Sequence, residues 1–300
     1  MARIRNEPRM ARRMAAFFGL VAGLALGGFA IASAASGTSA PEQYVVVRHV
    51  LYAGPNGELI SEEAGSTTVS AQFVVNQHIW ALNSLPVPVQ YNADGAPGGL
   101  SVTNIITQAI GTWNGAGSGF SFAWGGSSSG DTGSCAPGNP QIDGINTIRF
   151  ENLTGLTLGQ TCTIYPAGSS SKLIEFDMQL DNDGAWSADL PVPGNKYDLP
   201  TTILHELGHA AGLGHNCGPS SGITCTDSHK PALMYFQVSA GQDKRALTQD
   251  DLDGIRAAYP PVPTNTPTLT PTSTPTVAPT TPLPTVPASF KVRTLQLARD

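Results

Sequence analysis

The sequence predicts a domain of the α+β class, in which helices pack on a mixed β-sheet. Short runs rich in Val, Ile, Phe and Tyr, separated by turn residues, recur between Tyr44 and Asp181. Apolar residues at helical spacing occur at residues 100–114, from about residue 199 and at residues 247–259. Because strands and helices do not alternate regularly, we expect a small mixed sheet with helices packed on it.

The first 35 residues have the composition of a secretory signal. Residues 1–14 contain five Arg, and residues 15–34 carry no charge and end in small residues, so we expect a signal peptide at residues 1–35. An uncleaved membrane anchor is the alternative, since about 20 apolar residues can span a bilayer. Cleavage would leave 11 basic and 21 acidic residues, a net charge of about −10, which disfavours nucleic acid as a partner.

The strands follow in order. We assign residues 36–80 to an N-terminal extension or short pro-segment, which contains the strand-like run Tyr44–Tyr52, and residues 81–260 to one folded domain. Within that domain we expect strands at Pro86–Asn92, Phe120–Trp124, Asn146–Asn152, Cys162–Pro166 and Leu173–Asp181. The last of these has the period-two alternation of a strand.

Three helices are expected. Residues Leu100–Asn114 place their apolar side chains at helical spacing, and a second helix begins near Leu199–Thr202. The third begins at a capping-box pair formed by Thr248 and Asp251. Beyond it, residues 261–289 consist mainly of Pro and Thr and predict an extended linker or stalk, followed by a short tail at residues 290–300.

The chain has four cysteines: Cys135, Cys162, Cys217 and Cys225. An even number in an exported protein favours two disulfides, and we expect the local pairs Cys135–Cys162 and Cys217–Cys225. Zinc ligation by cysteine is the alternative, although no spacing resembles CxxC.

Half of the six histidines lie in one segment, His205–His215, with the sequence HELGHAAGLGH. On a helix, His205 and His209 lie one turn apart on the same face and can bind one metal ion, for which zinc is the expected species. Glu206 lies beside this pair, where a carboxylate can take a proton from a metal-bound water and deliver it to a leaving amine.

A continuing helix would carry His215 away from the metal. Gly212 can adopt a positive φ, end the helix and let the chain turn back, so that His215 becomes the third ligand. No glutamate follows Glu206 in the chain, so a glutamate ligand from a later helix is excluded. An aspartate ligand (Asp227, Asp243 or Asp250) stays open, but it would leave Gly212 and His215 unexplained.

The segment His205–His215 resembles the extended zinc motif of the metzincin metallopeptidases, and Pro231–Tyr235 (PALMY) resembles their Met-turn, with Met234 beneath the zinc ligands. Within the metzincins, the order of LPVPVQYN, FSFAWGG, IEFDMQLDNDGAWS and LTQDDLDGIRAAYP is similar to the landmarks of a matrixin-like (peptidase M10A-type) catalytic domain. The resemblance covers about Leu85 to Pro260.

This resemblance implies a zincin-like fold: a twisted, mostly parallel sheet with an antiparallel edge strand, three helices, and a cleft between an upper and a lower subdomain. The strand Leu173–Asp181 would be the antiparallel edge that receives an extended peptide. The Cys217–Cys225 disulfide would close the loop that forms a wall of the specificity pocket. Residues 36–134 contain no cysteine, so a matrixin-style cysteine switch is absent.

The expected protein is therefore a secreted, extracellular zinc endopeptidase that attacks peptide bonds of a protein or peptide substrate with zinc-bound water. His205, His209 and His215 would hold one catalytic Zn²⁺, and Glu206 would be the general base and acid. Ca²⁺ near Asp177–Asp183 is a second candidate cofactor. We expect a monomer that associates with a membrane or cell wall only through an uncleaved N-terminus or the C-terminal stalk.

Two alternatives stay open at this point. One is a surface-displayed binding or adhesion protein, in which the stalk presents a metzincin-like domain that does not cleave. The other is a processing enzyme of restricted specificity, in which residues 36–80 act as a propeptide or limit access of the substrate.

Overall fold

The computed structural model describes residues 44–54, 67–70, 73–136, 140–168, 172–218 and 221–261. The predicted signal at residues 1–35 and the predicted stalk and tail beyond residue 261 lie outside this part of the chain. None of the helices within it combines the length and the apolar character that a bilayer crossing requires.

The described residues form three α-helices, α1 (Val102–Asn114), α2 (Leu199–Ala210) and α3 (Gln249–Ala258), close to the predicted positions. They also include two short 3₁₀ helices, η1 (Leu82–Ser84) and η2 (Gly133–Cys135). The main sheet contains the strands β1 (Tyr44–Ala53), β4 (Val87–Tyr91), β5 (Phe122–Ser127), β6 (Thr147–Glu151), β7 (Thr157–Pro166), β8 (Glu175–Asp181) and β11 (Gln237–Val238). Two smaller sheets pair β2 (Thr67–Ser70) with β3 (Phe73–Asn76) and β9 (Trp186–Ser187) with β10 (Tyr197–Asp198).

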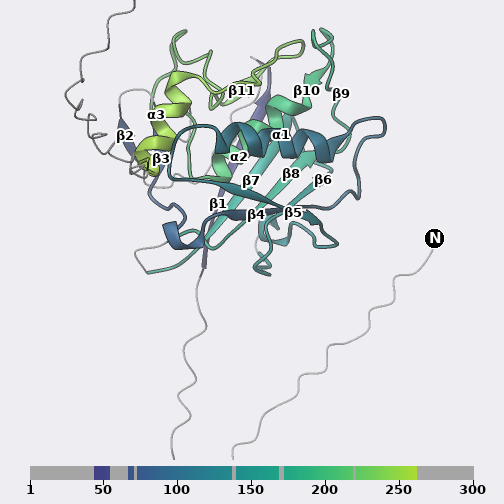
Figure 1. Ribbon diagram of the computed structural model, residues 1–300. Coiled ribbons are helices and arrows are strands. Elements are labelled where there is room, and N and C mark those ends of the chain that lie inside the picture. The colour runs from purple at the N-terminus through teal and green to yellow at the C-terminus, as the bar shows by residue number, and fades with distance from the viewer. Residues whose placement is uncertain are drawn as a thin grey trace, which may run out of the picture. The chain divides into compact units, whose positions relative to one another are not determined.

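The main sheet has the strand order β11-β1-β7-β8-β6-β4-β5 (Figure 1). Strands β8, β6, β4 and β5 run parallel to their neighbours, whereas β7 is antiparallel to β8. The predicted mixed, mostly parallel sheet with three helices is therefore confirmed, and the antiparallel strand β7 lies between β1 and β8.

The prediction for the identity of the antiparallel strand was wrong. Leu173–Asp181 contains β8, which lies inside the sheet, parallel to β6 on one side and antiparallel to β7 on the other. The antiparallel strand is β7, and its outer side is paired with β1. The alternation of polar and apolar residues in Leu173–Asp181 indicates that the two faces of the strand differ in polarity. It does not indicate which strands lie next to it.

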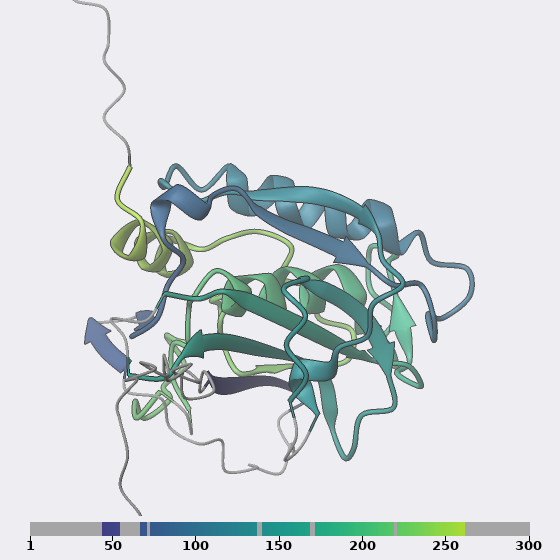
Figure 2. The same cartoon turned by 90° about the horizontal axis from the view of Figure 1, so that it is seen from below.

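Helices α1 and α2 pack against each other on one face of the sheet (Figures 1 and 2). Their buried faces place Ile106, Trp113, Ile203 and Leu207 in one core with the sheet residue Met178. The indole of Trp113 also donates a hydrogen bond to the Leu204 carbonyl of α2, which fixes the two helices against each other. This packing fixes α2, which carries His205 and His209, against one face of the sheet.

Candidate metal centre

Helix α2 starts at a well-defined point. Asp198 is its N-cap and accepts a hydrogen bond from the Thr201 amide, and Pro200 lies in the first turn, where its missing N–H costs nothing. The buried Asp198 carboxylate is also held by the guanidinium of Arg245. A fixed helix start sets which face of α2 carries His205 and His209.

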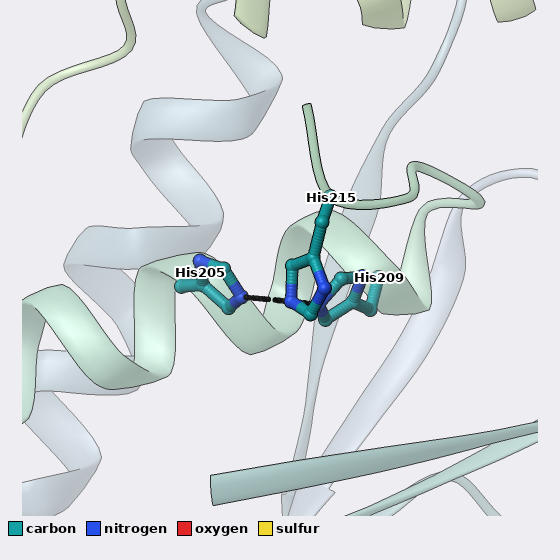
Figure 3. Close-up of side chains that lie close together, drawn as sticks. All are labelled: His205, His209 and His215. Atoms are coloured by element: carbon teal, nitrogen blue, oxygen red, sulfur yellow. Dashed lines mark hydrogen bonds between the residues drawn. The ribbon is translucent and has the colours of Figure 1, made fainter. Parts of the chain in front are cut away.

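The three histidines of the motif converge (Figure 3). The Nε2 atoms lie 3.0 Å apart for His205 and His209, 3.1 Å for His209 and His215, and 3.3 Å for His205 and His215. Four-coordinate zinc with Zn–N bonds of about 2.0–2.1 Å requires ligand nitrogens about 3.3 Å apart. The side chains present therefore fit the ion that the sequence predicts.

Gly212 makes this convergence possible. Helix α2 ends at Ala210, and the Gly212 and Leu213 amides donate back to the His209 and Gly208 carbonyls, the pattern of a Schellman motif. Gly212 has a φ of 98°, and a Cβ there would lie 3.0 Å from the Ile79 side chain. The positive φ at this position favours glycine, a Cβ would crowd Ile79, and the turn returns the chain toward α2.

Two of the three histidines, His205 and His209, direct their Nδ1 protons away from the centre. The Nδ1–H group of His205 donates to the Leu233 carbonyl at 2.7 Å, and that of His209 donates to the Leu213 carbonyl at 2.8 Å. These bonds leave the Nε2 lone pairs to face the other rings. Burial lowers the pKa of His205 to about 3 and the pKa values of His209 and His215 well below the usual value, so the rings are neutral at pH 7.

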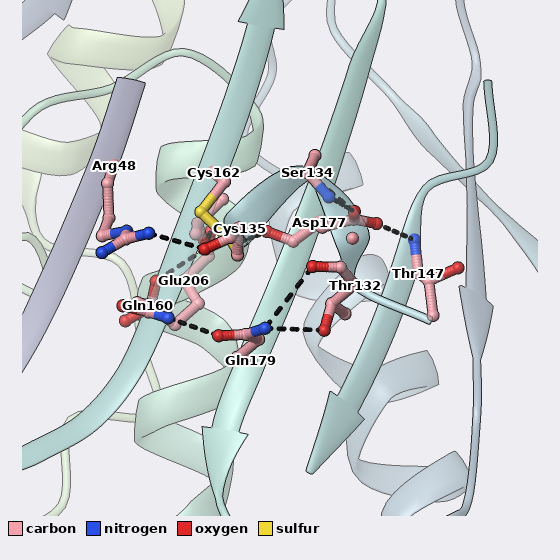
Figure 4. Close-up of a disulfide and its surroundings, with 12 residues drawn as sticks. Arg48, Thr132, Ser134, Cys135, Thr147, Gln160, Cys162, Asp177, Gln179 and Glu206 are labelled. Atoms are coloured by element: carbon pink, nitrogen blue, oxygen red, sulfur yellow. Dashed lines mark hydrogen bonds between the residues drawn. A yellow bond between two sulfur atoms is a disulfide. The ribbon is translucent and has the colours of Figure 1, made fainter. Parts of the chain in front are cut away.

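Glu206 lies under strand β7 (Figure 4). Its carboxylate Oε2 accepts a hydrogen bond of 2.6 Å from the Thr161 hydroxyl. Gly159, two residues earlier on β7, leaves room for it, because a Cβ there would lie 2.9 Å from Glu206 Oε1. The sequence did not reveal either β7 residue, since nothing in it indicates that Gly159–Thr161 lies over α2.

The predicted Met-turn packs against α2. Met234 is buried, and a Cβ on Gly208 would overlap its sulfur, so Gly208 allows this close approach. The Asp251 carboxylate accepts hydrogen bonds from the Leu233 and Met234 amides and from Thr248 in the capping box of α3. Asp251 therefore links the start of α3 to the turn whose Leu233 carbonyl holds His205. The sequence predicted the capping box but not this link.

The other candidate ligands do not join the site. Within the described part of the chain, the only cluster of three or more His, Cys, Asp or Glu ligand atoms within 4.8 Å of one another is the histidine triad. Asp227 instead pairs with Lys230, and Asp250 accepts a hydrogen bond from Asn216. The cysteines form the two expected pairs, Cys135–Cys162 and Cys217–Cys225.

The carboxylates near the candidate calcium region are buried. Asp177 accepts hydrogen bonds from the Ser134 amide and hydroxyl and from the Thr147 amide, and Asp181 accepts one from the Leu153 amide. Burial raises the pKa of both carboxyls to about 6. Calcium binding at this place stays a prediction.

Comparison with known proteins gives partial matches. A family model described as matrixin matches residues 159–260. Human matrix metalloproteinase-25 is 34% identical over 99 residues, 32% of this chain and 16% of the relative. Interstitial collagenase of Oryctolagus cuniculus is 38% identical over 85 residues, 28% and 15% of the two chains. Metalloendoproteinase 1 of Glycine max is 34% identical over 84 residues, 27% and 24%. The matches thus span less than a quarter of each relative.

The mixed sheet, the three-histidine site and the methionine turn define a metzincin-like domain. Within that class, residues 159–260 are similar to matrixin, so the resemblance predicted from the sequence is confirmed for this part of the chain.

Proposed function

We propose that the protein is a zinc-dependent endopeptidase with His205, His209 and His215 as metal ligands and Glu206 as general base and acid. The observation that carries the proposal is the convergence of three buried, neutral imidazoles, two of which are held at Nδ1 by backbone carbonyls, with the buried carboxyl group of Glu206 next to His205 in the chain. A zinc ion held there supplies a Lewis acid that polarises the peptide carbonyl and lowers the pKa of a coordinated water toward 7.

The residues of the chain supply the proton transfers and their geometry. Glu206 takes a proton from the attacking water and returns it to the leaving amine. The Thr161 hydroxyl orients the Glu206 carboxylate, since it donates to one of its two oxygens. Met234 and Asp251 support the turn that fixes His205. In this scheme the carboxylate is positioned before substrate arrives, which lowers the cost of orienting it in the reaction.

The compartment and partners are part of the same proposal. The signal-like residues 1–35 and the two disulfides support export to an extracellular location. The substrate is a protein or peptide, and the acidic chain does not favour nucleic acid. The Pro/Thr-rich residues 261–289 would serve as a stalk for a monomeric domain.

The test is a digest of a peptide library by the full chain, followed by mass spectrometry, with Glu206→Gln as the matched variant. Glutamine keeps the size of the side chain but cannot accept the proton, so cleavage should fall by about 10²–10⁴-fold while zinc content stays at one per chain. Each protein is tested both as the intact chain and after cleavage between residues 55 and 66 and removal of the N-terminal fragment, because strand β1 of that fragment lies beside the candidate site.

Equal cleavage by the parent chain and Glu206→Gln would contradict the proposed role of Glu206 and point to a contaminating protease. Tight zinc binding without cleavage, also after release of β1, would contradict the peptidase proposal. That result would favour the alternative of a non-catalytic binding or adhesion domain on a stalk.

A further inference from the structure

Strand β7 lies beside the candidate metal centre, and its side away from β8 is the side on which a further strand can pair. Gly159 and Thr161 of this strand contact Glu206, and α2 packs directly against β7. A peptide in extended conformation that approached the histidines along the sheet would form its backbone hydrogen bonds with this edge.

Strand β1 of the same chain occupies that edge. It runs antiparallel to β7 from Tyr44, opposite Pro166, to Tyr52, opposite Thr157. On its other side it runs parallel to β11, where the Tyr52 amide donates to the Phe236 carbonyl and the Gly54 amide donates to the Val238 carbonyl. The backbone of β1 is thus paired with β7 along most of its length, and its C-terminal end is also paired with the segment that follows the Met-turn.

The register places the middle of β1 beside the catalytic groups. His49 lies opposite Thr161, and Leu51 lies opposite Gly159, the two β7 residues that contact Glu206. The His49 ring is 5% exposed and stacks on the His209 ring with centroids 4.5 Å apart and an interplanar angle of 13°. Asn76 of β3 donates a hydrogen bond to His49 Nε2, so a second segment of the extension holds this ring in place.

The side chains of β1 close the site further. Val50 and Tyr52 pack in an apolar cluster with Cys217 and Phe236, which lie on the two sides of the methionine turn. His205 and His209 are fully buried, and His215 is 2% exposed. A catalytic metal needs a coordination position that substrate can reach. The described fold therefore corresponds to a closed arrangement.

We propose that β1 is an inhibitory strand that occupies the peptide-binding edge in place of substrate, so that the chain folds in a closed state and acts on other proteins only after β1 has left the sheet. The proposal rests on the proposed function. Neither disulfide involves β1, and β1 lies outside both the matrixin match at residues 159–260 and the wider resemblance from Leu85 to Pro260. Besides the strand pairing, β1 is held by Arg48, whose guanidinium donates a hydrogen bond to the Cys135 carbonyl (Figure 4).

Two ways of releasing β1 test this proposal in the full chain. The first is a recognition site for a specific protease, inserted between residues 55 and 66, followed by cleavage and separation of the N-terminal fragment. The second is Val50→Asp, which places a carboxylate in the apolar cluster around Phe236 and should expel the strand. Val45→Asp is the matched control, because Val45 is half-buried at the far end of β1, opposite Tyr165.

The primary readout does not require catalysis. Each protein is loaded with Co²⁺, and the change in its visible spectrum on titration with a small peptide hydroxamate measures access to the metal. We expect the cut chain and Val50→Asp to bind the hydroxamate at least about tenfold more tightly than the intact chain and Val45→Asp, because the closed state reduces the competent population. A synthetic Tyr44–Ala53 peptide should reverse the gain.

Equal hydroxamate affinity in the intact and cut chains would overturn the proposal. Loss of the near-ultraviolet circular dichroism on release of β1 would also overturn it, because β1 would then be an integral strand of the fold. If release raises hydroxamate affinity but no peptide in the library is cleaved, the inhibitory role of β1 stands as occlusion of the metal and the peptidase proposal fails.

Discussion

The histidine triad at α2 and the carboxylates of Glu175 and Asp177 on β8 are both buried clusters of ionisable groups, but burial has opposite consequences for metal binding in them. Desolvation lowers the pKa of His205 to about 3, whereas it raises the pKa of Glu175 to about 7 and that of Asp177 to about 6. Both shifts favour the neutral form. A neutral imidazole keeps a lone pair for a metal, whereas a carboxyl becomes a poorer ligand once pH falls below its raised pKa and it gains a proton.

The hydrogen bonds strengthen the contrast. In the triad, Nδ1–H groups point outward to backbone carbonyls, and the Nε2 atoms come within 3.0–3.3 Å of one another. On β8, Asp177 is bound by Ser134 and Thr147, and Glu175 accepts a hydrogen bond from the Gly144 amide. Burial alone does not define a metal centre, and within the described residues the convergence of three ligand atoms is what distinguishes the triad.

Substitution of a histidine ligand should produce the largest difference in zinc affinity between variants of the triad and variants of the β8 carboxyls. Loss of a hydrogen-bond partner behind a ligand typically costs about 10–100-fold in metal affinity, so His209→Ala, which removes a ligand itself, should lower zinc affinity by more than about a hundredfold. Zinc content after dialysis against a chelator measures this. His229→Ala and Glu175→Gln are the controls, and zinc loss in either of them to the same extent would contradict the contrast.

Gly212→Ala should damage the triad through the backbone. Alanine at a φ of 98° is strained by about 1–2 kcal/mol, and its Cβ would press on Ile79. We expect lower stability in urea and weaker zinc binding, because His215 follows this turn. Gly98→Ala has open space around it and should change neither property. A Gly212→Ala protein as stable as the parent would show that the turn tolerates other conformations.

Thr161→Val should affect turnover but not metal content. The variant loses the hydroxyl that donates to Glu206 Oε2, a bond to a charged group worth about 1.5 kcal/mol, so kcat/KM measured after release of β1 should fall about tenfold. Thr163→Val, at another buried position on β7, is the matched control. An equal effect of the two substitutions would mean that Thr161 acts only through the packing of the strand.

The smallest effect concerns pH and Glu175. Its folded-state pKa is raised, so its stabilising contribution is fully present below the unfolded-state value near 4.5 and is lost as pH rises through about 7. Between pH 5 and 7.5, the parent should lose on the order of 1 kcal/mol of unfolding free energy relative to Glu175→Gln. Urea unfolding at several pH values checks this, with Asp94→Asn at an exposed carboxylate as control. If the unfolding free energies of the parent and of Glu175→Gln changed with pH in parallel, the raised pKa of Glu175 would be refuted.

Much of the metal site could be predicted because its determinants are local in sequence. The i, i+4 spacing of His205 and His209, the glycine that ends α2 and the capping box at Thr248 all depend on nearby residues. The same holds for the Cys217–Cys225 pair, which closes a short loop.

The parts that could not be predicted depend on long-range strand pairing. Nothing in Tyr44–Ala53 indicates that it pairs with β7 rather than lying apart as an extension. The strand β7 was predicted only from Cys162 onward, because Gly159 and Gln160 have low strand propensity, and so the contact of Thr161 with Glu206 was missed. Neighbours of a strand are set by the whole sheet, and the sequence of one strand does not specify them.

Zinc K-edge X-ray absorption on the purified full chain tests the central claim most directly. The account predicts one zinc per chain with three imidazole nitrogens at about 2.0–2.1 Å and no sulfur ligand. Sulfur ligands at about 2.3 Å, or a spectrum that is unchanged in His209→Ala, would contradict it.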